Sequence, residues 1–469
     1  MNEERSPSNR ANYEESVRAL LALGRELASP QHARVQKFGL DNITSLARGL
    51  GEPHRAVPCV HIAGTNGKGS TAAMLESILR AAGMRTGLYT SPHLERINER
   101  IRINGQEISD AGFAAAWTQV RDAIEKLLAA GKLAAHPTYF ECMTAMAFLA
   151  FAEERVDCAV YEVGLGGRLD ATNIVTPEVA ILTQIDFDHE NFLGHSIQEI
   201  AGEKAGIIKP GAWVVSSVER AEAREVVARR CAEMNARLVE VDGEWQIENV
   251  RASGGYSRAT AVSKDGACKI ALKPGLPGRF QLRNALTAAT ATRLLAERGF
   301  SISDDAIARG TAAVKWPGRL ERILDRPAVY LDGTHNPAGA RELLKFWDEN
   351  FAGRRIFLVY GSVRDKAVDE IAGLLFPRAD RIILTELRQP RAISAPLLAE
   401  MTSHLAVHSS MVRDPAEALE RAIELAGPED AVFATGSLYL VGDLRSYWRA
   451  RETGPAPAVA RAGSSTKFR

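Results

Sequence analysis

The chain has 469 residues, with 58 Lys and Arg against 58 Asp and Glu, so its formal net charge is zero. This neutrality argues against a nucleic-acid-binding protein that relies on a basic surface, because neutralising phosphates requires clustered positive charge. Hydrophobic residues make up 46% and charged residues 25%, which is ordinary globular usage and excludes wholesale disorder, a collagen-like protein and a disulfide scaffold. At about 150 residues per domain, the length predicts two large domains or three smaller ones.

The cysteines and the N-terminus bear on the compartment. The five cysteines are odd in number and include no Cys-x-x-Cys pair, a pattern that suits a reducing compartment better than a disulfide framework or a zinc site. The first residues are polar and charged, without the apolar core of a secretion signal. The longest apolar stretch, residues 142–152, is too short beside the roughly 20 residues of a membrane span and predicts a buried helix. We expect a cytoplasmic protein without a membrane partner.

Both ends of the chain lack hydrophobic periodicity, and we expect disorder over residues 1–11 and 451–469. A first helix is predicted from Tyr13, with Asn12 as its N-cap. Short β-branched runs then alternate with helical patterns, which predicts an α/β fold with parallel sheets covered by helices on both faces. The predicted strands cover residues 57–63, 158–163, 179–185, 328–331, 355–360, 381–384 and 431–434, and the predicted helices cover residues 70–82 and 197–208.

Proline and glycine interrupt this alternation at residues 314–319, and a second series of strands and helices starts beyond them. The interruption predicts two α/β domains, which we place at residues 12–312 and 313–450, with the catalytic cleft between them. Ligands of open α/β sheets bind outside the carboxyl ends of the strands, so the loops that follow the predicted strands are the candidate functional site.

The first such loop covers residues 64–71, between a predicted strand and a predicted helix. Its glycines allow close backbone approach, consecutive N–H groups can surround an anion, and a helix N-terminus favours phosphate. Lys68 is placed to contact the outer phosphates. Ser70 or the following threonine is placed to bind a metal ion. The match to the P-loop pattern is imperfect, because Gly69 is inserted after the lysine and Ile62 stands at the first glycine position. A Gly-rich turn with a solvated lysine is the alternative.

Two further loops carry carboxylates. Glu162 ends a predicted strand and is a candidate Mg²⁺ ligand, since Mg²⁺ takes one or two carboxylates beside phosphate oxygens. The Gly-x-Gly that begins at Gly164 could open a dinucleotide-binding fingerprint, but Leu169 stands at the third glycine position. The loop over residues 186–191 gathers acids around His189, an arrangement that can hold a divalent cation or perform acid–base work. A helix-capping loop is the alternative there.

Each of the other polar loops, taken alone, is only weak evidence for a functional site. Lys204 lies in a predicted helix, where a solvated surface charge is the simplest interpretation of one lysine. Residues 332–337 follow an apolar run, and the turn formers Asp-Gly and Asn-Pro explain much of this segment by turn geometry alone. Arg319, residues 365–366 and Ser437 occupy comparable loop positions.

Taken together and in chain order, these loops resemble the folylpolyglutamate synthase/dihydrofolate synthase family, the folate branch of the Mur ligases. The resemblance runs from about residue 13 to residue 448, and the inserted Gly69 is what this family's phosphate loop looks like. The matching blocks are residues 61–70, 90–94, 138–141, 162–173, 186–189, 203–207, 316–319, 332–337 and 390–392. The resemblance implies a two-domain fold, with an N-terminal P-loop-type mononucleotide-binding ATPase domain and a C-terminal Rossmann-like glutamate ligase domain.

The resemblance also implies an activity, which is ATP-dependent amide ligation. The carboxylate of dihydropteroate or of a tetrahydrofolate takes the γ-phosphoryl group of ATP to form an acyl phosphate, and the amine of L-glutamate displaces phosphate. A carboxylate is a poor electrophile whose charge repels the triphosphate, so lysine and Mg²⁺ must neutralise that charge while the two domains align the substrates. We expect two Mg²⁺ ions as cofactors, ATP as co-substrate, small molecules as partners and a monomer.

Family positions carried onto this sequence assign a residue set to each part of the site. The ATP set is Thr65, Asn66, Gly67, Lys68, Gly69, Ser70, Asn284, Arg319 and Asp332. The metal set is Ser70, Ser91, Glu162, His189 and Lys204, the last at the position that is carbamylated in relatives, and the catalytic set is Lys68, Glu162, His189 and Lys204. The pteroate or folate set is Thr138, Tyr139, Phe140, Glu141, Leu169, Asp170 and Ala171, and the glutamate set is His335 and Ser437.

Two other functions stay open at this point. A Mur ligase acting on a nucleotide-sugar peptide would share the phosphate loop and the carbamylated lysine, but it leaves residues 91–93 and 166–170 unexplained. A non-catalytic nucleotide-binding regulatory module would bind ATP without acceptor-dependent hydrolysis, and the presence of Glu162 and His189 disfavours it.

Overall fold

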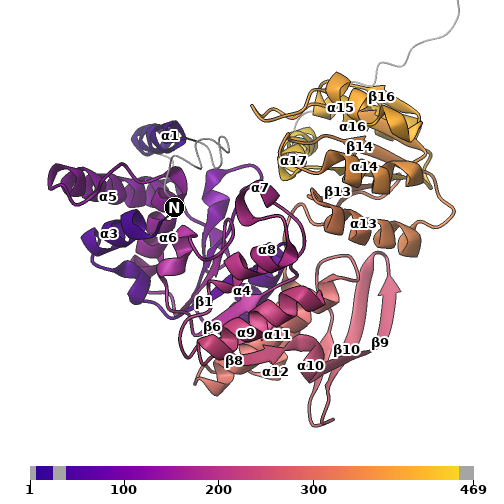
Figure 1. Cartoon of the computed structure of the whole chain (residues 1–469). Helices are drawn as coiled ribbons and strands as arrows, with labels where there is room; N and C mark the ends of the chain where they lie inside the picture. The colour runs from indigo at the N-terminus through magenta and orange to yellow at the C-terminus, as the bar shows by residue number, and fades with distance from the viewer. Residues whose placement is uncertain (1–6, 25–38, 454–469) are drawn as a thin grey trace, which may run out of the picture.

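The structure is a computed structural model that describes residues 7–24 and 39–453. It contains three sheets, of eight, three and six strands. Figure 1 shows two lobes: a first lobe that holds the eight-stranded sheet together with the small antiparallel sheet, and a second lobe, orange to yellow, that holds the six-stranded sheet. The fold is α/β with parallel sheets, and the predicted fold class is confirmed.

The eight-stranded sheet has the order β4-β3-β2-β5-β1-β6-β7-β8, in which only the β3 and β4 edge is antiparallel. Its strands are β1 (Cys59–Ala63), β2 (Thr86–Tyr89), β3 (Ile101–Ile103), β4 (Gln106–Glu107), β5 (Cys158–Glu162), β6 (Val179–Leu182), β7 (Trp213–Ser216) and β8 (Arg237–Glu240). Helices cover both faces of this sheet, and every residue of β1 and β5 is therefore buried.

Side chains alternate between the two faces of the sheet, as strand geometry requires. Val60 and Ile62 of β1 pack in one apolar cluster with α4 (Lys68–Ala81), α11 (Gln281–Glu297) and α12 (Asp304–Ala313). Cys59 and Tyr161 belong to a cluster on the opposite face. The helices of that face are α1 (Pro7–Ala22), α3 (Asp41–Gly49), α5 (Asp110–Ala129), α6 (Tyr139–Glu153), α8 (Ile197–Ala205) and α9 (Ala221–Glu233).

The three-stranded antiparallel sheet was not anticipated from the sequence. It consists of β9 (Trp245–Ser253), β10 (Tyr256–Ser263) and β11 (Lys269–Leu272). Alternate residues of β10 are buried, and Ala259 and Ala261 pack against the α4 and α11 cluster. Figure 1 shows the β9–β10 hairpin extending from the first lobe toward α13 of the second lobe.

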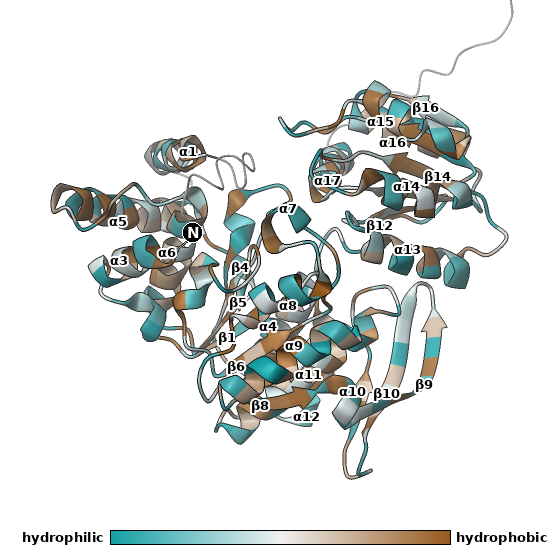
Figure 2. Ribbon diagram, viewed as in Figure 1, coloured by the Kyte–Doolittle hydropathy of each residue, from teal (hydrophilic) through white to brown (hydrophobic). Residues whose placement is uncertain are grey.

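The second lobe is built on a sheet of order β12-β13-β17-β14-β15-β16, antiparallel only at β12. Its strands are β12 (Glu321–Leu324), β13 (Ala328–Leu331), β14 (Ile356–Tyr360), β15 (Arg381–Leu384), β16 (Ser409–Met411) and β17 (Ala431–Thr435). One face packs on α13 (Pro337–Asn350), α14 (Val368–Leu375) and α15 (Ala395–Met401), and the other on α16 (Pro415–Leu425) and α17 (Leu438–Thr453). Figure 2 shows hydrophobic residues concentrated in the strands and hydrophilic residues on the outer helices.

Several short helices complete the fold. They are α7 (Glu190–Leu193), α10 (Val241–Glu244), η2 (Pro53–Arg55), η3 (Ile97–Arg100), η4 (Ala171–Ile174), η5 (Phe376–Arg378) and η6 (Ser403–Leu405). Within residues 7–24 and 39–453, no helix combines the length and the apolar character that crossing a bilayer requires.

Each predicted strand and helix is present; the strands over residues 328–331 and 381–384 have the predicted bounds, and the others have shifted ends. The predicted strand over residues 179–185 stops at Leu182, because the Gln184 carbonyl turns toward the phosphate loop and accepts the Thr65 N–H at 2.7 Å. The predicted helix over residues 70–82 begins earlier, at Lys68. The predicted buried helix over residues 142–152 lies inside α6.

The disorder predicted for the chain ends is wrong where the structure describes them. α1 begins at Pro7, and Asn12 lies within this helix and not at its N-cap, since its carbonyl accepts the Ser16 hydroxyl at 2.7 Å. Proline suits the first helical turn, and a polar first turn leaves no hydrophobic pattern to read. At the other end α17 continues to Thr453. Residues 1–6 and 454–469 lie outside the described residues.

Gly310 allows α12 to approach α4 closely, and Gly310→Ala is expected to destabilise the protein. A Cβ at this position would lie 2.4 Å from the Ile78 Cα, and the Ser77 hydroxyl donates to the Gly310 carbonyl at 2.7 Å. We expect a loss of about 1–3 kcal/mol, measured by urea unfolding, because overpacking must separate the two helices.

Gly373→Ala is the matched control for this test. Gly373 also lies inside a helix, but nothing stands within 4 Å of its missing Cβ. This variant is expected to gain up to about 1 kcal/mol from helix propensity. Equal gains at both positions would contradict the close packing of α4 and α12.

Candidate active site

A cavity of about 660 Å³ lies between the two lobes, at the carboxyl ends of the parallel strands of the large sheet. The first lobe contributes the loops that follow β1, β2, β5 and β6, and the second lobe contributes the segments on either side of β13. This is where ligands of open α/β sheets bind. The predicted site residues that line the cavity are residues 65–70, Ser91, Glu162, His189, Lys204, Asn284, Arg319, Asp332 and His335.

The phosphate loop connects β1 to α4 and depends on two glycines. Gly64 has a φ of 152° and Gly67 a φ of 87°, in the region that side chains disfavour. A Cβ at Gly64 would lie 1.8 Å from the Thr183 Oγ1, and a Cβ at Gly67 would lie 2.6 Å from the Asn284 Oδ1. Both positions therefore require glycine, and the loop places the N-terminus of α4 at the cavity.

Two buried lysines converge on one carbonyl of this loop. The Lys68 Nζ and the Lys204 Nζ each donate to the Gly64 carbonyl at 2.9 Å. Burial lowers the pKa of Lys68, and the Glu162 carboxylate partly opposes this effect. Burial, together with the nearby Lys68 charge, lowers the pKa of Lys204 to about 7. The two ammonium groups repel each other and leave the cavity with unneutralised positive charge beside the loop.

Glu162, at the end of β5, is the acid that most favours the charged form of Lys68. Burial raises the pKa of Glu162, whereas the Lys68 ammonium and the backbone N–H of Ser91 favour its charged form. That N–H donates to the Glu162 Oε2 at 3.1 Å. A Cβ at Gly69 would lie 3.6 Å from the Glu162 Oε1, so the carboxylate faces the first turn of α4. The predicted ligand Ser70, in the same turn, accepts a hydrogen bond from Gln281.

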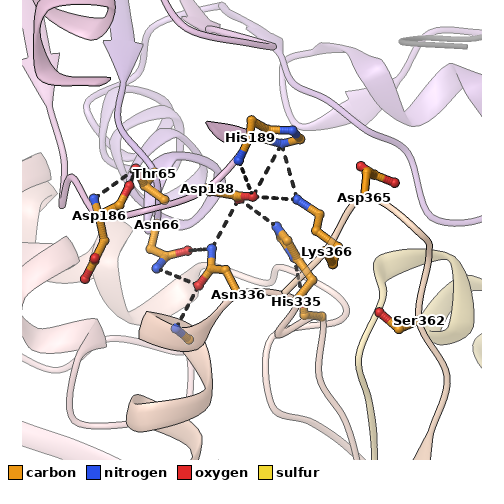
Figure 3. A network of polar contacts seen from close by, with 12 residues as sticks. Thr65, Asn66, Asp186, Asp188, His189, His335, Asn336, Ser362, Asp365 and Lys366 are labelled. Atoms are coloured by element: carbon orange, nitrogen blue, oxygen red, sulfur yellow. Dashed lines mark hydrogen bonds and ion pairs between the residues drawn. The ribbon is translucent and has the colours of Figure 1, made fainter. Parts of the chain in front are cut away.

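Asp188 joins the two lobes in the cavity wall (Figure 3). Its Oδ1 lies 2.7 Å from the Lys366 Nζ, its Oδ2 lies 3.5 Å from the His335 Nε2, and the Asn336 amide donates to Oδ2 at 3.3 Å. Burial alone would raise the pKa of Asp188, but the Lys366 ammonium and the His335 hydrogen bond hold it well below its usual range. The Asn66 and Asn336 amides also bond to each other across the cleft, at 2.9 and 3.2 Å.

His189 stands beside this network in its neutral form. Burial and the Lys366 charge lower the pKa of His189 to about 3. Its Nε2 lies 3.3 Å from the Lys366 Nζ, while its Nδ1 is buried and finds no hydrogen-bond partner among the described residues. The Lys366 ammonium can only donate, so the Nε2 holds the lone pair of the neutral ring and the Nδ1 carries the proton. The Nε2 is therefore the nitrogen that could act as a metal ligand, in place of its contact with Lys366.

The second lobe presents Arg319 and Asp332 to the cavity. The Asp332 carboxylate accepts the N–H groups of Leu320 at 2.9 Å and of Thr334 at 3.0 Å. It therefore ties the segment that carries Arg319 to the loop that carries His335. The latter loop leads into α13, whose N-cap is Asn336.

The predicted pteroate segment at the start of α6 does not reach the cavity. No described residue of 138–141 is among those that line it. Thr138 is the N-cap of α6, and its hydroxyl accepts the Glu141 N–H at 3.2 Å. The Phe140 ring lies directly behind the cavity wall, since a Cβ at Gly164 would be 2.5 Å from its Cζ.

Two other predicted residues also lie behind the wall. Asp170 accepts the N–H groups of Gly164 and Leu165, both at 3.0 Å, and thereby shapes the loop that lines the cavity. The Ser437 hydroxyl accepts the Tyr439 N–H at 3.2 Å at the start of α17. Direct substrate contact by residues 138–141, residues 169–171 and Ser437 stays a prediction.

Sequence reasoning assigned no role to Asp188, Asn336 or Lys366, which the structure places at the centre of the cleft. Asp188 stands next to His189, and an acid beside a candidate ligand was a usable signal. The sequence around Asn336 and Lys366 indicates only a turn and a loop. Their roles could not be predicted, because their partners lie in the other lobe.

The donors in the cavity fit a magnesium ion that binds with a nucleotide. Over residues 7–24 and 39–453, no group of three or more His, Cys, Asp or Glu side chains could hold a metal ion alone. Mg²⁺ needs only one or two carboxylates when phosphate oxygens and water complete its shell. The Glu162 carboxylate, the Ser70 hydroxyl and the neutral His189 imidazole match that requirement.

The chain is similar to known dihydrofolate synthase/folylpolyglutamate synthase proteins over nearly its whole length. It is 36% identical over 419 residues to the protein of that name from Bacillus subtilis (strain 168), a match that covers 88% of this chain and 96% of the relative. It is 34% identical over 437 residues to the folylpolyglutamate synthase of Lacticaseibacillus casei, a match that covers 92% of this chain and 98% of the relative.

Solved structures show the same similarity. Mycobacterium tuberculosis folylpolyglutamate synthase complexed with ADP has a TM-score of 0.85 and 32% identity, covering 94% of this chain and 99% of that one. E. coli FolC in complex with DHPP and ADP has a TM-score of 0.81 and 30% identity, and the match covers 97% of this chain and 100% of that one.

Two family descriptions match the two lobes. The Mur ligase middle domain matches residues 62–292, and the Mur ligase glutamate ligase domain matches residues 318–438. With this fold, this cleft and these relatives, the chain belongs to the folylpolyglutamate synthase/dihydrofolate synthase family of Mur-type ligases.

Proposed function

We propose that this protein uses ATP to join L-glutamate to the carboxylate of dihydropteroate, of a tetrahydrofolate, or of both, through an acyl phosphate. The observation that carries the proposal is the cavity between the lobes, where Lys68, Glu162 and Arg319 lie around one phosphate loop. Family membership supplies the substrate class. An acyl phosphate needs a phosphate loop and charge neutralisation but no protein nucleophile.

In this proposal the phosphate loop holds the β- and γ-phosphates of ATP. The N–H groups at the start of α4 and the Lys68 ammonium meet the outer oxygens. A charge pair at 4 Å is worth about 1 kcal/mol in water and about 4 kcal/mol at an effective dielectric near 20, so the dry cavity strengthens each contact. Asn284, Arg319 and Asp332 contact the rest of the nucleotide, the last two from the second lobe.

We assign Mg²⁺ to Ser70, Ser91, Glu162 and His189, with a carbamylated Lys204 as a further ligand for a second ion. When bound, Mg²⁺ neutralises phosphate charge and makes the γ-phosphorus more electrophilic. Lys204 suits carbamylation because its pKa of about 7 leaves much of the amine neutral at physiological pH, and only the neutral amine adds to carbon dioxide.

The chain's residues then have separate tasks in the two steps. Residues 12–312 bind ATP and the pteroate or folate, with residues 138–141 and 169–171 around the pterin-bearing substrate. Residues 313–450 bind L-glutamate, with His335 and Ser437 on that side. Closing the lobes holds the amine against the acyl phosphate, which supplies the proximity that a three-substrate reaction requires.

We also propose a cytoplasmic monomer. Support for the compartment comes from the five cysteines, all of which are free thiols, as in a reducing environment.

The direct test incubates the protein with ATP, Mg²⁺, L-glutamate and one acceptor at a time, and measures phosphate release. Release is expected with dihydropteroate, with tetrahydrofolate, or with both, and only when glutamate is present. A UDP-muramoyl acceptor tests the nucleotide-sugar alternative. Nucleotide binding without release for any acceptor would favour a regulatory module and overturn the proposal.

Lys68→Ala and Glu162→Ala are each expected to lower kcat about 100-fold or more while leaving the fold intact, because the first removes the ammonium that meets the reacting phosphates and the second removes a Mg²⁺ ligand. Lys132→Ala, at an exposed lysine that does not line the cavity, is the control and should keep full activity. Melting temperature reports the fold. Near-normal turnover in either active-site variant would remove the role assigned to that residue.

Lys204→Met is expected to abolish ligation and yet, at neutral pH and without carbon dioxide, to be more stable than the uncarbamylated wild type. Folding lowers the pKa of Lys204 from 10.5 to about 7, so burying its charge destabilises the native state fully at and below pH 7. As pH rises from 7 toward 10.5 the native state sheds the proton and the penalty disappears. The gain in melting temperature of the methionine variant should therefore be largest at pH 6–7 and shrink by pH 9. A constant gain across this range would contradict a charged, buried Lys204.

A further inference from the structure

The loop that follows β2 carries Ser91 and docks on the second lobe. The Leu94 side chain packs with the apolar cluster of α17 and β17, and a Cβ at Gly318 would lie 3.2 Å from its Cδ1. The helix approaches so closely that a Cβ at Gly442 would stand 2.1 Å from the Leu94 carbonyl oxygen. Residues 94–95 are therefore the contact of the first lobe with α17.

The next side chain, Glu95, is held by α17 alone. Its carboxylate accepts from Arg445, from the Ser446 hydroxyl at 3.2 Å and from Arg449 at 3.3 Å. The Glu95 and Arg445 side chains are only 13% and 15% exposed. A pair removed from water to this degree is screened less by salt than a surface ion pair.

Arg445 also holds a second carboxylate. Its Nε lies 3.0 and 3.1 Å from the two oxygens of Glu321, and the Glu321 Oε2 accepts the Gly318 N–H at 2.9 Å. Gly318 directly precedes Arg319, which lines the cavity. One guanidinium thus connects the loop of Ser91 to the segment of Arg319.

Hydrogen bonds within the loop after β2 connect the residues that contact α17 to the residues at the cavity. The Glu99 carboxylate accepts the N–H groups of Leu94, Glu95 and Arg96 at 2.8–2.9 Å, which makes the docking residues one rigid turn. At the start of the same loop the Ser91 N–H binds the Glu162 carboxylate. A shift of α17 would therefore move this loop and change the position of the Glu162 carboxylate.

We propose that Arg445 is a positioning residue: with Glu95 and Glu321 it latches the two lobes together, so that Glu162 and Arg319 face each other across the cavity. The effect on catalysis rests on the proposed ligase function, whereas the effect on lobe separation does not. Arg445 touches no substrate and acts through the two loops that it connects.

The test compares variants that break the latch in different ways. Arg445→Met removes the charge and keeps the stem, and Gly442→Ala inserts a wedge between α17 and Leu94. Arg449→Met is the control, because this side chain also pairs with Glu95 but is 62% exposed, whereas Arg445 is 15% exposed. Arg445→Lys keeps the positive charge but lacks the planar guanidinium that bonds to two carboxylates at once. This variant therefore tests whether charge alone restores part of the activity.

We expect Arg445→Met and Gly442→Ala to lower kcat about ten- to a hundredfold, because misplacing the reacting groups is costly. The dissociation constant for ADP should rise by a smaller factor, because Arg319 moves away from the nucleotide while the phosphate loop stays in place. Small-angle scattering should show a larger radius of gyration for both variants, and Arg445→Lys should fall between them and the wild type. Arg449→Met should leave all three quantities unchanged.

Two results would overturn the proposal: an unchanged radius of gyration in both latch variants, or a lower melting temperature with kcat and lobe separation intact, which would make the cluster merely structural. If the wild type proves inactive while the latch variants still open, the ligase function fails and the latch stands. The two ideas are therefore separable in one set of samples.

Discussion

The carbonyl oxygen of Gly64 accepts two buried ammonium groups, those of Lys68 and Lys204, each at 2.9 Å. Burial lowers the pKa of both amines, because two positive charges side by side away from water are costly, and much of Lys204 is neutral near pH 7. Burial also raises the pKa of Glu162. In the proposed function the phosphates of ATP bind beside these groups, at the N-terminus of α4. The rest of the first lobe holds this arrangement in place.

The second lobe completes the site through polar contacts at two points. On one side Asp188 receives Lys366, His335 and Asn336 in a buried network (Figure 3). On the other side Arg445 holds Glu95 and Glu321. Charged contacts of this kind are specific in geometry and reversible, as inter-domain surfaces that must open for substrates require.

Several residues that look like ligands from their loops serve as supports for the ligand-bearing backbone. Asp170 binds the N–H groups of Gly164 and Leu165, and the Thr172 hydroxyl connects Asp170 to the buried His61 at 2.7 Å. Asp332 binds two backbone groups in the same way. Such supports hold the cavity wall at a fixed shape before any substrate enters, which spares the reaction the cost of ordering it later.

The sequence alone determined the elements and the local chemistry. Strand and helix periodicity identified the parallel sheets, and the glycines around Lys68 identified the phosphate loop, because these signals depend on neighbours along the chain. It missed the β9–β11 sheet and the start of α1, whose residues are too polar for a periodic pattern. Only the tertiary structure decided that Lys204 is buried beside Lys68 and that Lys366 and Arg445 bridge the lobes. A charge acquires such a role from partners more than a hundred residues away, and no local pattern records that distance.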